Sequence, residues 1–220
     1  SRLAQISQQP PLFDFPRTNL PESFHYTGPF RDTCMSTTEF PWDQLDGRPL
    51  VYASLGSLQG AKKELFRTLA GACEGTGVQM VLSHGNALTP DALSKLPGSP
   101  LVVGYAPQFE LLKRASLTLT HAGLNTVLDS LSHGVPQVAI PLTYEQPAIA
   151  QRIQWSGCGE VVPFPRANVE RIRAAILLVL SSPSYRDAAQ RISKSIQASG
   201  GVSRAADVIQ MAVCATPYGT

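Results

Sequence analysis

The stretch Thr120–Gln146, THAGLNTVLDSLSHGVPQVAIPLTYEQ, decides how the rest of the chain is organised. It begins at the end of an apolar, β-rich run and passes through a turn of small residues, His121-Ala122-Gly123. Apolar residues then recur at spacings of three and four, which predicts a helix over Leu124–Ser132. Gly134 ends that helix, and a second apolar strand follows over residues 137–140. The stretch therefore predicts a strand–turn–helix–strand unit.

The turn of this unit has the features of an anion site. A turn that opens a helix directs free backbone N–H groups, and the positive end of the helix dipole, at one point. Phosphate binds at such points. Gly123 would let a ligand approach the backbone, and His121, Asn125 and Thr126 can each donate a hydrogen bond to a phosphate oxygen.

Short apolar strands alternate with amphipathic helices along most of the chain. The strands are expected at 50–54, 79–82, 101–103, 117–120, 137–140 and 159–162. The helices are expected at 63–74, 109–113, 124–132, 146–155, 169–180, 185–198 and 203–214. This alternation predicts an α/β fold, a Rossmann-like doubly wound parallel sheet of about six strands with helices on both faces.

The strand-to-helix turns of such a sheet share one edge. Those turns are residues 55–57, 83–85, 105–108, 121–123 and 142–146. Because ligands of doubly wound folds bind at this edge, where the strand order reverses, we expect the site there.

Composition limits the function classes. The chain has 220 residues and a net charge of +2, with no cluster of Lys and Arg, so no nucleic-acid partner is expected. Its four cysteines, Cys34, Cys73, Cys158 and Cys214, are far apart and form no metal-spaced pair, which favours free thiols in a reducing cytoplasm. No signal peptide or membrane-length apolar run is present. Peripheral contact with a membrane surface stays open.

The pattern divides the chain into three parts. Residues 1–48 are rich in proline and aromatics without periodicity and are interpreted as a linker or peripheral segment. Residues 49–214 form the ordered domain, and residues 215–220 a tail. Because the chain begins with Ser1-Arg2 and not with Met, we expect a fragment of a longer protein, cut near an interdomain connection.

Four short motifs occur in a fixed order within the ordered domain. They are Tyr105-Ala106-Pro107-Gln108, the His-x-Gly-x-Asn-Thr run of His121 to Thr126, Asp129 followed by Gly134-Val135-Pro136, and Glu145-Gln146. Together they resemble the donor-binding signature of nucleotide-sugar-dependent glycosyltransferases of the GT-B architecture, the UDP-glycosyltransferase family. The resemblance covers Pro49 to about Val213, and its flanking sequences look closest to bacterial carotenoid (zeaxanthin) glucosyltransferases. In the family Trp is usual at Tyr105, Glu at Asp129 and Asp at Glu145.

The resemblance implies a role for each motif. Tyr105 would stack on the nucleobase, and the Ala106 backbone and Gln108 would bond to base and ribose. Asp129 would accept from the ribose hydroxyls. The residues expected around the diphosphate are Gly56, Ser57, His121, Gly123, Asn125 and Thr126, and those expected at the sugar hydroxyls are Glu145 and Gln146.

The implied reaction is transfer of a hexose, glucose, from a UDP-sugar to a hydroxyl of an apolar small-molecule acceptor, with inversion; a carotenoid acceptor rests on the resemblance alone. Donors aimed at the leaving diphosphate would stabilise charge in the transition state, so no metal cofactor is expected. In the family the general base and acceptor pocket belong to an N-terminal domain, which is expected to precede residue 1. The chain alone is therefore expected to bind donor without transferring sugar and to hold no catalytic residue.

Two other functions stay open. One is half of a sugar-nucleotide epimerase, for which Glu145 is the evident acid–base candidate, and the other is a non-catalytic nucleotide-binding domain. At single residues, Asp129 has the alternative of a solvated helix position, and His84 is expected in a surface loop.

Overall fold

The computed structural model describes residues 3–31, 38–56 and 63–214, and its centre is one parallel sheet. The strands are β3 (Leu50–Ser54), β4 (Gln79–Ser83), β5 (Leu101–Val103), β6 (Ala115–Thr120), β7 (Gln137–Ala139) and β8 (Gly159–Val161). They lie in the order β5-β4-β3-β6-β7-β8, and every neighbouring pair is parallel. The order reverses between β3 and β6, so the predicted doubly wound sheet is confirmed.

The helices follow the predicted alternation. They are α1 (Lys63–Cys73), α2 (Pro90–Leu93), α3 (Gln108–Leu112), α4 (Leu124–Ser132), α5 (Gln146–Trp155), α6 (Val169–Ser181), α7 (Pro183–Ala198) and α8 (Gly201–Cys214). Only α2 lacks a counterpart in the sequence prediction. It is a single turn whose N-cap, Thr89, accepts a hydrogen bond from the Ala92 N–H, and it is too short to show periodicity.

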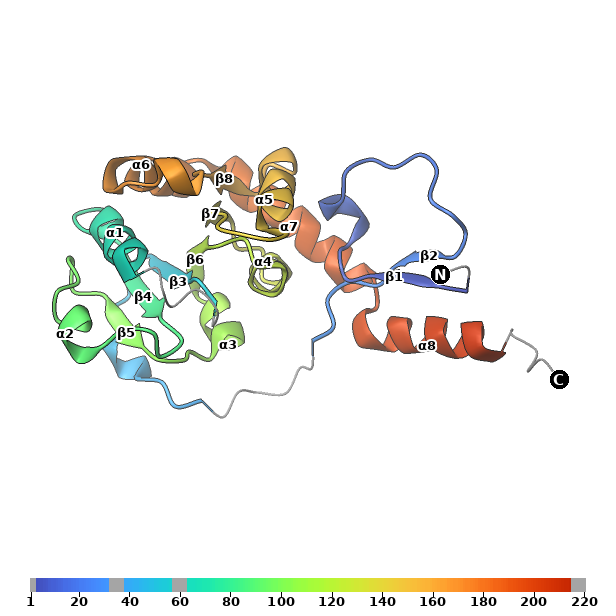
Figure 1. Ribbon diagram of the computed structural model, residues 1–220, viewed down its shortest axis with the longest axis horizontal. Helices are drawn as coiled ribbons and strands as arrows, with labels where there is room; N and C mark the ends of the chain where they lie inside the picture. The colour runs from blue at the N-terminus through green and yellow to red at the C-terminus, as the bar shows by residue number, and fades with distance from the viewer. Residues whose placement is uncertain (1–2, 32–37, 57–62, 215–220) are drawn as a thin grey trace.

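Alternate residues of each strand feed two apolar layers. In β3, Val51 and Ala53 join the cluster beneath α1 and α6, whereas Leu50 and Tyr52 face the cluster that holds α3. Helices α4 and α5 cover the same face as α3, and α7 packs on α4 (Figure 1). Because both faces are covered, the strands read as nearly continuous apolar runs.

The segment before the sheet has structure that its sequence did not indicate. Strands β1 (Gln5–Ser7) and β2 (Phe24–Tyr26) pair in parallel, beside the corner between α7 and α8 (Figure 1). The Gly201 N–H that begins α8 donates to the Thr27 carbonyl at 2.6 Å. Three short 3-10 helices, η1 (Pro11–Phe13), η2 (Trp42–Gln44) and η3 (Phe164–Arg166), complete the described elements.

A buried carboxylate fastens this segment to α5. Asp14 is 3% exposed, accepts from the Tyr26 hydroxyl at 2.8 Å and pairs with Arg152 at 3.2 Å. Burial alone would raise the pKa of Asp14, but the bonds from Tyr26 and Arg152 and the charge of Arg17 outweigh it and hold that pKa below its usual value. The segment therefore packs against the domain through contacts distant in sequence.

Two further findings concern the whole described part of the chain. None of its helices combines the length and apolar character that crossing a bilayer requires. Cys73, Cys158 and Cys214 are free thiols, and Cys34 lies outside the described residues.

Candidate functional site

A cavity of about 480 Å³ lies at the carboxyl edge of the sheet, where the strand order reverses. Seven of the residues predicted for the site line it: Gly56, His121, Gly123, Asn125, Thr126, Glu145 and Gln146. Leu55, Leu124 and Tyr144 also line it and were not predicted. The turns after β3 and β6 and the start of α5 thus meet around one space, as parallel strands require.

The N-terminus of α4 opens into this cavity. Its N-cap is Gly123, which has no side chain to cap the helix, and the first backbone bond runs from the Val127 N–H to the Gly123 carbonyl at 3.1 Å. Among the described residues no acceptor meets the amides of Leu124, Asn125 and Thr126. Three N–H donors and the positive end of the helix dipole are therefore available to an anion.

The ring of His121 is held between two glycines. A Cβ at Gly123 would lie 2.5 Å from its Nε2, and a Cβ at Gly56 would lie 2.9 Å from its Cε1. Neither position can carry a side chain while the ring stays in place. Nδ1 of His121 is buried and has no hydrogen-bond partner among the described residues.

Burial also sets the protonation of His121. It lowers the pKa of the imidazole, and the nearby Ser54 backbone and Glu145 carboxylate oppose this shift without reversing it. The ring is therefore neutral near pH 7, with one nitrogen able to donate and the other able to accept.

Two residues at the cavity have left-handed backbone conformations. Ala122 has φ 65°, and Tyr144, which is 83% exposed, has φ 56°. Such conformations cost a non-glycine residue on the order of 1 kcal/mol and often occur at functional sites. No helix or strand pattern predicts that Tyr144 lines the cavity. The sequence signal for it was its position next to Glu145, in a turn at this edge of the sheet.

The turn before α5 is closed by a buried amide. Oε1 of Gln146 accepts from the Leu142 N–H at 2.9 Å and the Thr143 N–H at 3.0 Å, so its amide nitrogen is the part left to face a ligand. Glu145 is exposed at the cavity's edge. No Lys or Arg is among the described residues that line the cavity, so the N-terminus of α4 is the feature there that would attract an anion.

Two of the remaining predicted residues, Gln108 and Asp129, meet one turn further along α4. Asp129 is 3% exposed, which rules out the solvated position. Nε2 of Gln108 donates to Asp129 at 2.6 Å, and the Tyr52 hydroxyl donates to Gln108 at 3.2 Å. Arg31 bonds to both carboxylate oxygens of Asp129, a contact that spans 98 positions and had no sequence signal.

The motif that ends at Gln108 begins with an exposed aromatic ring. Tyr105 is 56% exposed, and Ala106 packs against the apolar layer under α3. Ser57 lies outside the described residues.

The expectation that His84 lies in a surface loop is wrong. The residue is 7% exposed, and its Nδ1 accepts from the Leu88 N–H at 3.0 Å. Its ring holds the turn after β4 in place, because a buried loop needs acceptors for its amides.

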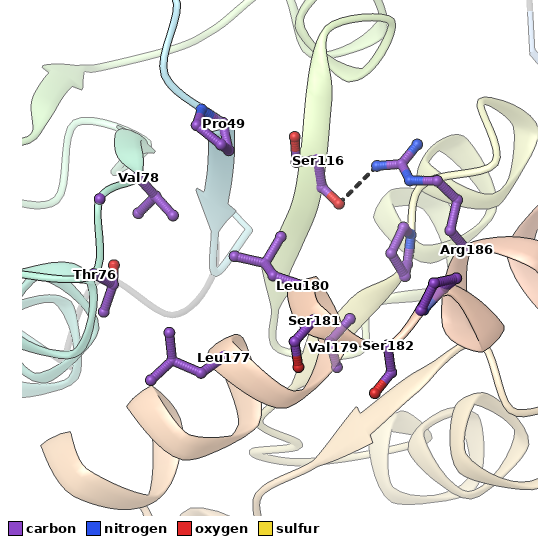
Figure 2. A pocket seen from close by; sticks show the side chains of 13 residues that line it. Pro49, Thr76, Val78, Ser116, Leu177, Val179, Leu180, Ser181, Ser182 and Arg186 are labelled. Carbon is purple, nitrogen blue, oxygen red and sulfur yellow. Dashed lines mark hydrogen bonds between the residues drawn. The ribbon is translucent and has the colours of Figure 1, made fainter.

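A second cavity, of about 570 Å³, lies at the opposite edge of the sheet (Figure 2). Pro49, Ser116 and Pro136 line it at the amino ends of strands, and exposed apolar side chains such as Leu177 form its wall. Arg186 is its charged residue, and that guanidinium donates to the Ser116 carbonyl at 2.9 Å. The described lining of the larger cavity holds no His, Asp or Glu, whereas that of the smaller one includes His121 and Glu145. Nowhere in the described ranges do three His, Cys, Asp or Glu residues group as a metal site would require.

An uncapped helix N-terminus at the switch point of a doubly wound sheet is typical of the class of nucleotide-binding α/β domains. Within this class, residues 77–210 match the family described as Erythromycin biosynthesis protein CIII-like, C-terminal domain. The chain belongs to this family, whose domain is the C-terminal half of GT-B glycosyltransferases.

Individual relatives agree with the family. The chain is 36% identical to zeaxanthin glucosyltransferase of Pantoea ananas over 97% of this chain and 50% of that protein. It is 38% identical to the enzyme of the same name from Pseudescherichia vulneris, over 97% and 51%. The crystal structure of CalG4, the calicheamicin glycosyltransferase, superposes with a TM-score of 0.82 at 26% identity, covering 96% of this chain and 54% of that one. The chain spans about half the length of the curated relatives it matches.

Proposed function

We propose that this chain is the donor-binding domain of an enzyme that transfers glucose from UDP-glucose to a hydroxyl of an apolar small molecule, a carotenoid. The observation that carries the proposal is the uncapped N-terminus of α4, beside the His121 ring in the cavity at the switch point. The names of the two relatives that match over 97% of the chain support glucose and carotenoid as the substrates.

The diphosphate would lie on the N-terminus of α4. The amides of Leu124, Asn125 and Thr126 are unpaired donors there, and the exposed Asn125 side chain adds another. Gly56 and Gly123 leave the space that the His121 ring occupies, which keeps that ring beside the start of α4. His121 donates from one ring nitrogen in its neutral form.

The nucleoside would lie along α3, toward Tyr105. The exposed Tyr105 ring is free to stack on a nucleobase, and the Ala106 backbone is next to it. Gln108 and Asp129 form a hydrogen-bonded pair that would face the ribose.

The sugar would lie at the start of α5. The exposed carboxylate of Glu145 accepts from sugar hydroxyls, and the free amide nitrogen of Gln146 donates to them. Neither residue is charged positively, so this end of the cavity suits a neutral hexose.

These placements describe a substitution at the anomeric carbon. The acceptor oxygen attacks from the face opposite the diphosphate, the bond from the anomeric carbon to the phosphate oxygen breaks, and UDP leaves with the electron pair. The helix amides and His121 stabilise the charge that develops on the leaving oxygens, and the proposal assigns no metal to this task. The acceptor's proton goes to a base that the proposal places outside these 220 residues, so this chain alone would bind donor without transfer.

Calorimetry with UDP, UMP and uridine tests the proposal. We expect saturable binding of UDP at submillimolar concentration, and weaker binding of UMP and uridine in that order, because each lost phosphate removes contacts to α4. The absence of saturable heat with millimolar UDP would refute it. Incubation with UDP-glucose alone adds a second test, since its conversion to another UDP-hexose would favour an epimerase.

A further inference from the structure

The carboxylate of Asp129 is nearly filled with hydrogen bonds before any ligand arrives. Nε of Arg31 donates to Oδ1 at 2.7 Å, and Nη2 of Arg31 donates to Oδ2 at 2.6 Å. Nε2 of Gln108 donates to Oδ2 as well, at 2.6 Å. An ionised carboxylate offers about four acceptor positions, so three are occupied and one, on Oδ1, is left.

A second hydrogen bond orients the Gln108 amide toward Asp129. The hydroxyl of the buried Tyr52 donates to Oε1 of Gln108, which turns Nε2 toward Asp129. Burial, and secondarily the charge of Asp129, raise the pKa of Tyr52 to about 12, so the hydroxyl keeps its proton and stays a donor.

Arg31 is bound more firmly than a surface arginine. Its bond to Asp129 is bidentate and charge-assisted, and the carboxylate is only 5% exposed, although the arginine side chain is 41% exposed. Withdrawing the guanidinium would leave a buried carboxylate without a cation, which is strongly unfavourable. A neutral ribose hydroxyl is a poor replacement for that charge, so the pair persists when a nucleotide binds.

We propose that Arg31 leaves Asp129 able to accept a hydrogen bond from one ribose hydroxyl and not from two. The donor site therefore accepts 2′-deoxyribonucleotide sugars nearly as well as ribonucleotide sugars. The proposal rests on the function proposed above, since it needs the ribose to face Asp129. A cis-diol brings two donors to a carboxylate, and only one acceptor position is left for them. The 2′-hydroxyl therefore adds little to binding while Arg31 is in place.

The test compares UDP with 2′-deoxy-UDP, which share base and diphosphate, by calorimetry on the whole chain. In the unchanged chain we expect their dissociation constants to agree within about threefold. Arg31→Lys keeps the positive charge but lacks the fixed pair of N–H donors, and Arg31→Met removes the charge. Each substitution frees acceptor positions on Asp129. Since a hydrogen bond to a charged group changes affinity about tenfold or more, the preference for UDP should rise to about tenfold in Arg31→Met, with Arg31→Lys between.

Arg48→Met is the matched control. Arg48 also pairs with an aspartate, Asp46, at 2.6 Å, but it bonds to the Val78 carbonyl at the opposite edge of the sheet. Its loss should leave the ratio of the two affinities unchanged. Thermal unfolding shows whether each variant folds. If Arg31→Met does not fold, the comparison of UDP with 2′-deoxy-UDP in Arg31→Lys tests the role of Arg31.

The outcomes separate the two proposals. A strong preference of the unchanged chain for UDP, or a ratio that the Arg31 variants leave unaltered, would overturn the role of Arg31 while UDP binding stands. Failure of the unchanged chain to bind UDP would overturn the proposed function, and the inference about Arg31 with it.

Discussion

Two turns at the same edge of the sheet look alike in sequence and differ in what they leave free. After β4 the chain runs Ser83-His84-Gly85-Asn86, and after β6 it runs from Thr120 through His121 and Gly123 to Asn125. Nδ1 of His84 accepts from the Leu88 N–H, and the Gly85 N–H donates to the Gly104 carbonyl at 2.7 Å. Nδ1 of His121 has no partner among the described residues.

The difference follows from what comes next along the chain. The nine-residue helix α4 begins directly after the second turn, so its first amides open at the cavity. After the first turn comes a loop in which the amides of Ala87 and Leu88 bond back to His84, and then the single turn of α2. Histidine and glycine after a strand are therefore not enough to indicate an anion site. Backbone N–H groups without acceptors at the start of a helix do indicate one.

The largest difference in UDP affinity between the two turns is expected when Gly123 and Gly85 are each replaced by alanine. In Gly123→Ala the new Cβ would lie 2.5 Å from Nε2 of His121, so the ring must leave its place beside the start of α4 and the proposed diphosphate site is disrupted. We expect UDP affinity to fall by at least about 100-fold, the upper range for a lost bond to a charged group. Calorimetry measures this, and thermal unfolding should show little change because φ of Gly123 is −67°, which alanine adopts.

Gly85→Ala is its counterpart at the closed turn. Gly85 has φ 59°, so the substitution should cost about 1–2 kcal/mol of stability and leave UDP affinity within about twofold. Equal losses of affinity in both variants would mean that the two turns do not differ as described.

The two histidines should separate binding from stability. His121→Ala removes a donor at the diphosphate and should weaken UDP binding about 10- to 100-fold. His84→Ala should keep UDP affinity within about twofold but lose about 1–3 kcal/mol of unfolding free energy, because the Leu88 N–H loses its acceptor in a buried loop. Calorimetry and urea unfolding of both variants check this, and unaltered UDP affinity in His121→Ala would remove that ring from the site.

A smaller effect tests how far the site at the second turn extends. Glu145→Gln removes the charge and replaces one acceptor oxygen by an amide donor, at the sugar and not at the diphosphate, so UDP-glucose should bind about 5- to 10-fold more weakly while UDP binds as before. The two titrations are compared directly. A parallel loss for both ligands would place Glu145 at the diphosphate instead.

The smallest expected effect is a dependence on pH. Burial lowers the pKa of both His84 and His121, whereas in the unfolded chain each protonates near pH 6.5. Below that pH the unfolded chain binds more protons, so stability falls as pH falls toward the folded pKa values. A bound diphosphate would raise the pKa of His121 and so reverse the part of the stability loss that His121 causes.

Urea unfolding at pH 7.5 and 5.5, with and without UDP-glucose, measures the part of the loss that His121 causes. UDP-glucose is preferred to UDP because it lacks the terminal phosphate, which itself titrates near pH 6. The nucleotide should stabilise the unchanged chain and His84→Ala more at pH 5.5 than at 7.5. In His121→Ala its effect should be the same at both, and a persisting difference there would assign the proton to another group.

Most of the sheet was predictable from sequence, because its strands and helices carry strong periodic patterns and a helix such as α4 has both a start and a stop signal. The turn at residues 121–123 and the start of α4 after it were predictable for the same reason, because their pattern is local. Long-range pairing was not. Arg31 meets Asp129 across 98 positions, and Asp14 meets Arg152 across 138, with no pattern at either end.

The proline-rich start of the chain shows the same limit. Strands β1 and β2 have three residues each, QIS and FHY, and lack the continuous apolar run by which the equally short β5, LVV, was recognised. His84 was misplaced because sequence alone does not show whether a polar ring finds a backbone partner.

A crystal of this chain soaked in UDP is the most direct test of the claim that the unpaired donors at the start of α4 hold a pyrophosphate. The account predicts diphosphate oxygens within hydrogen-bond distance of the Asn125 and Thr126 amides and the His121 ring, with uracil against Tyr105. Nucleotide bound in the other cavity, beside Leu177 and Arg186, with the start of α4 left bare, would contradict it.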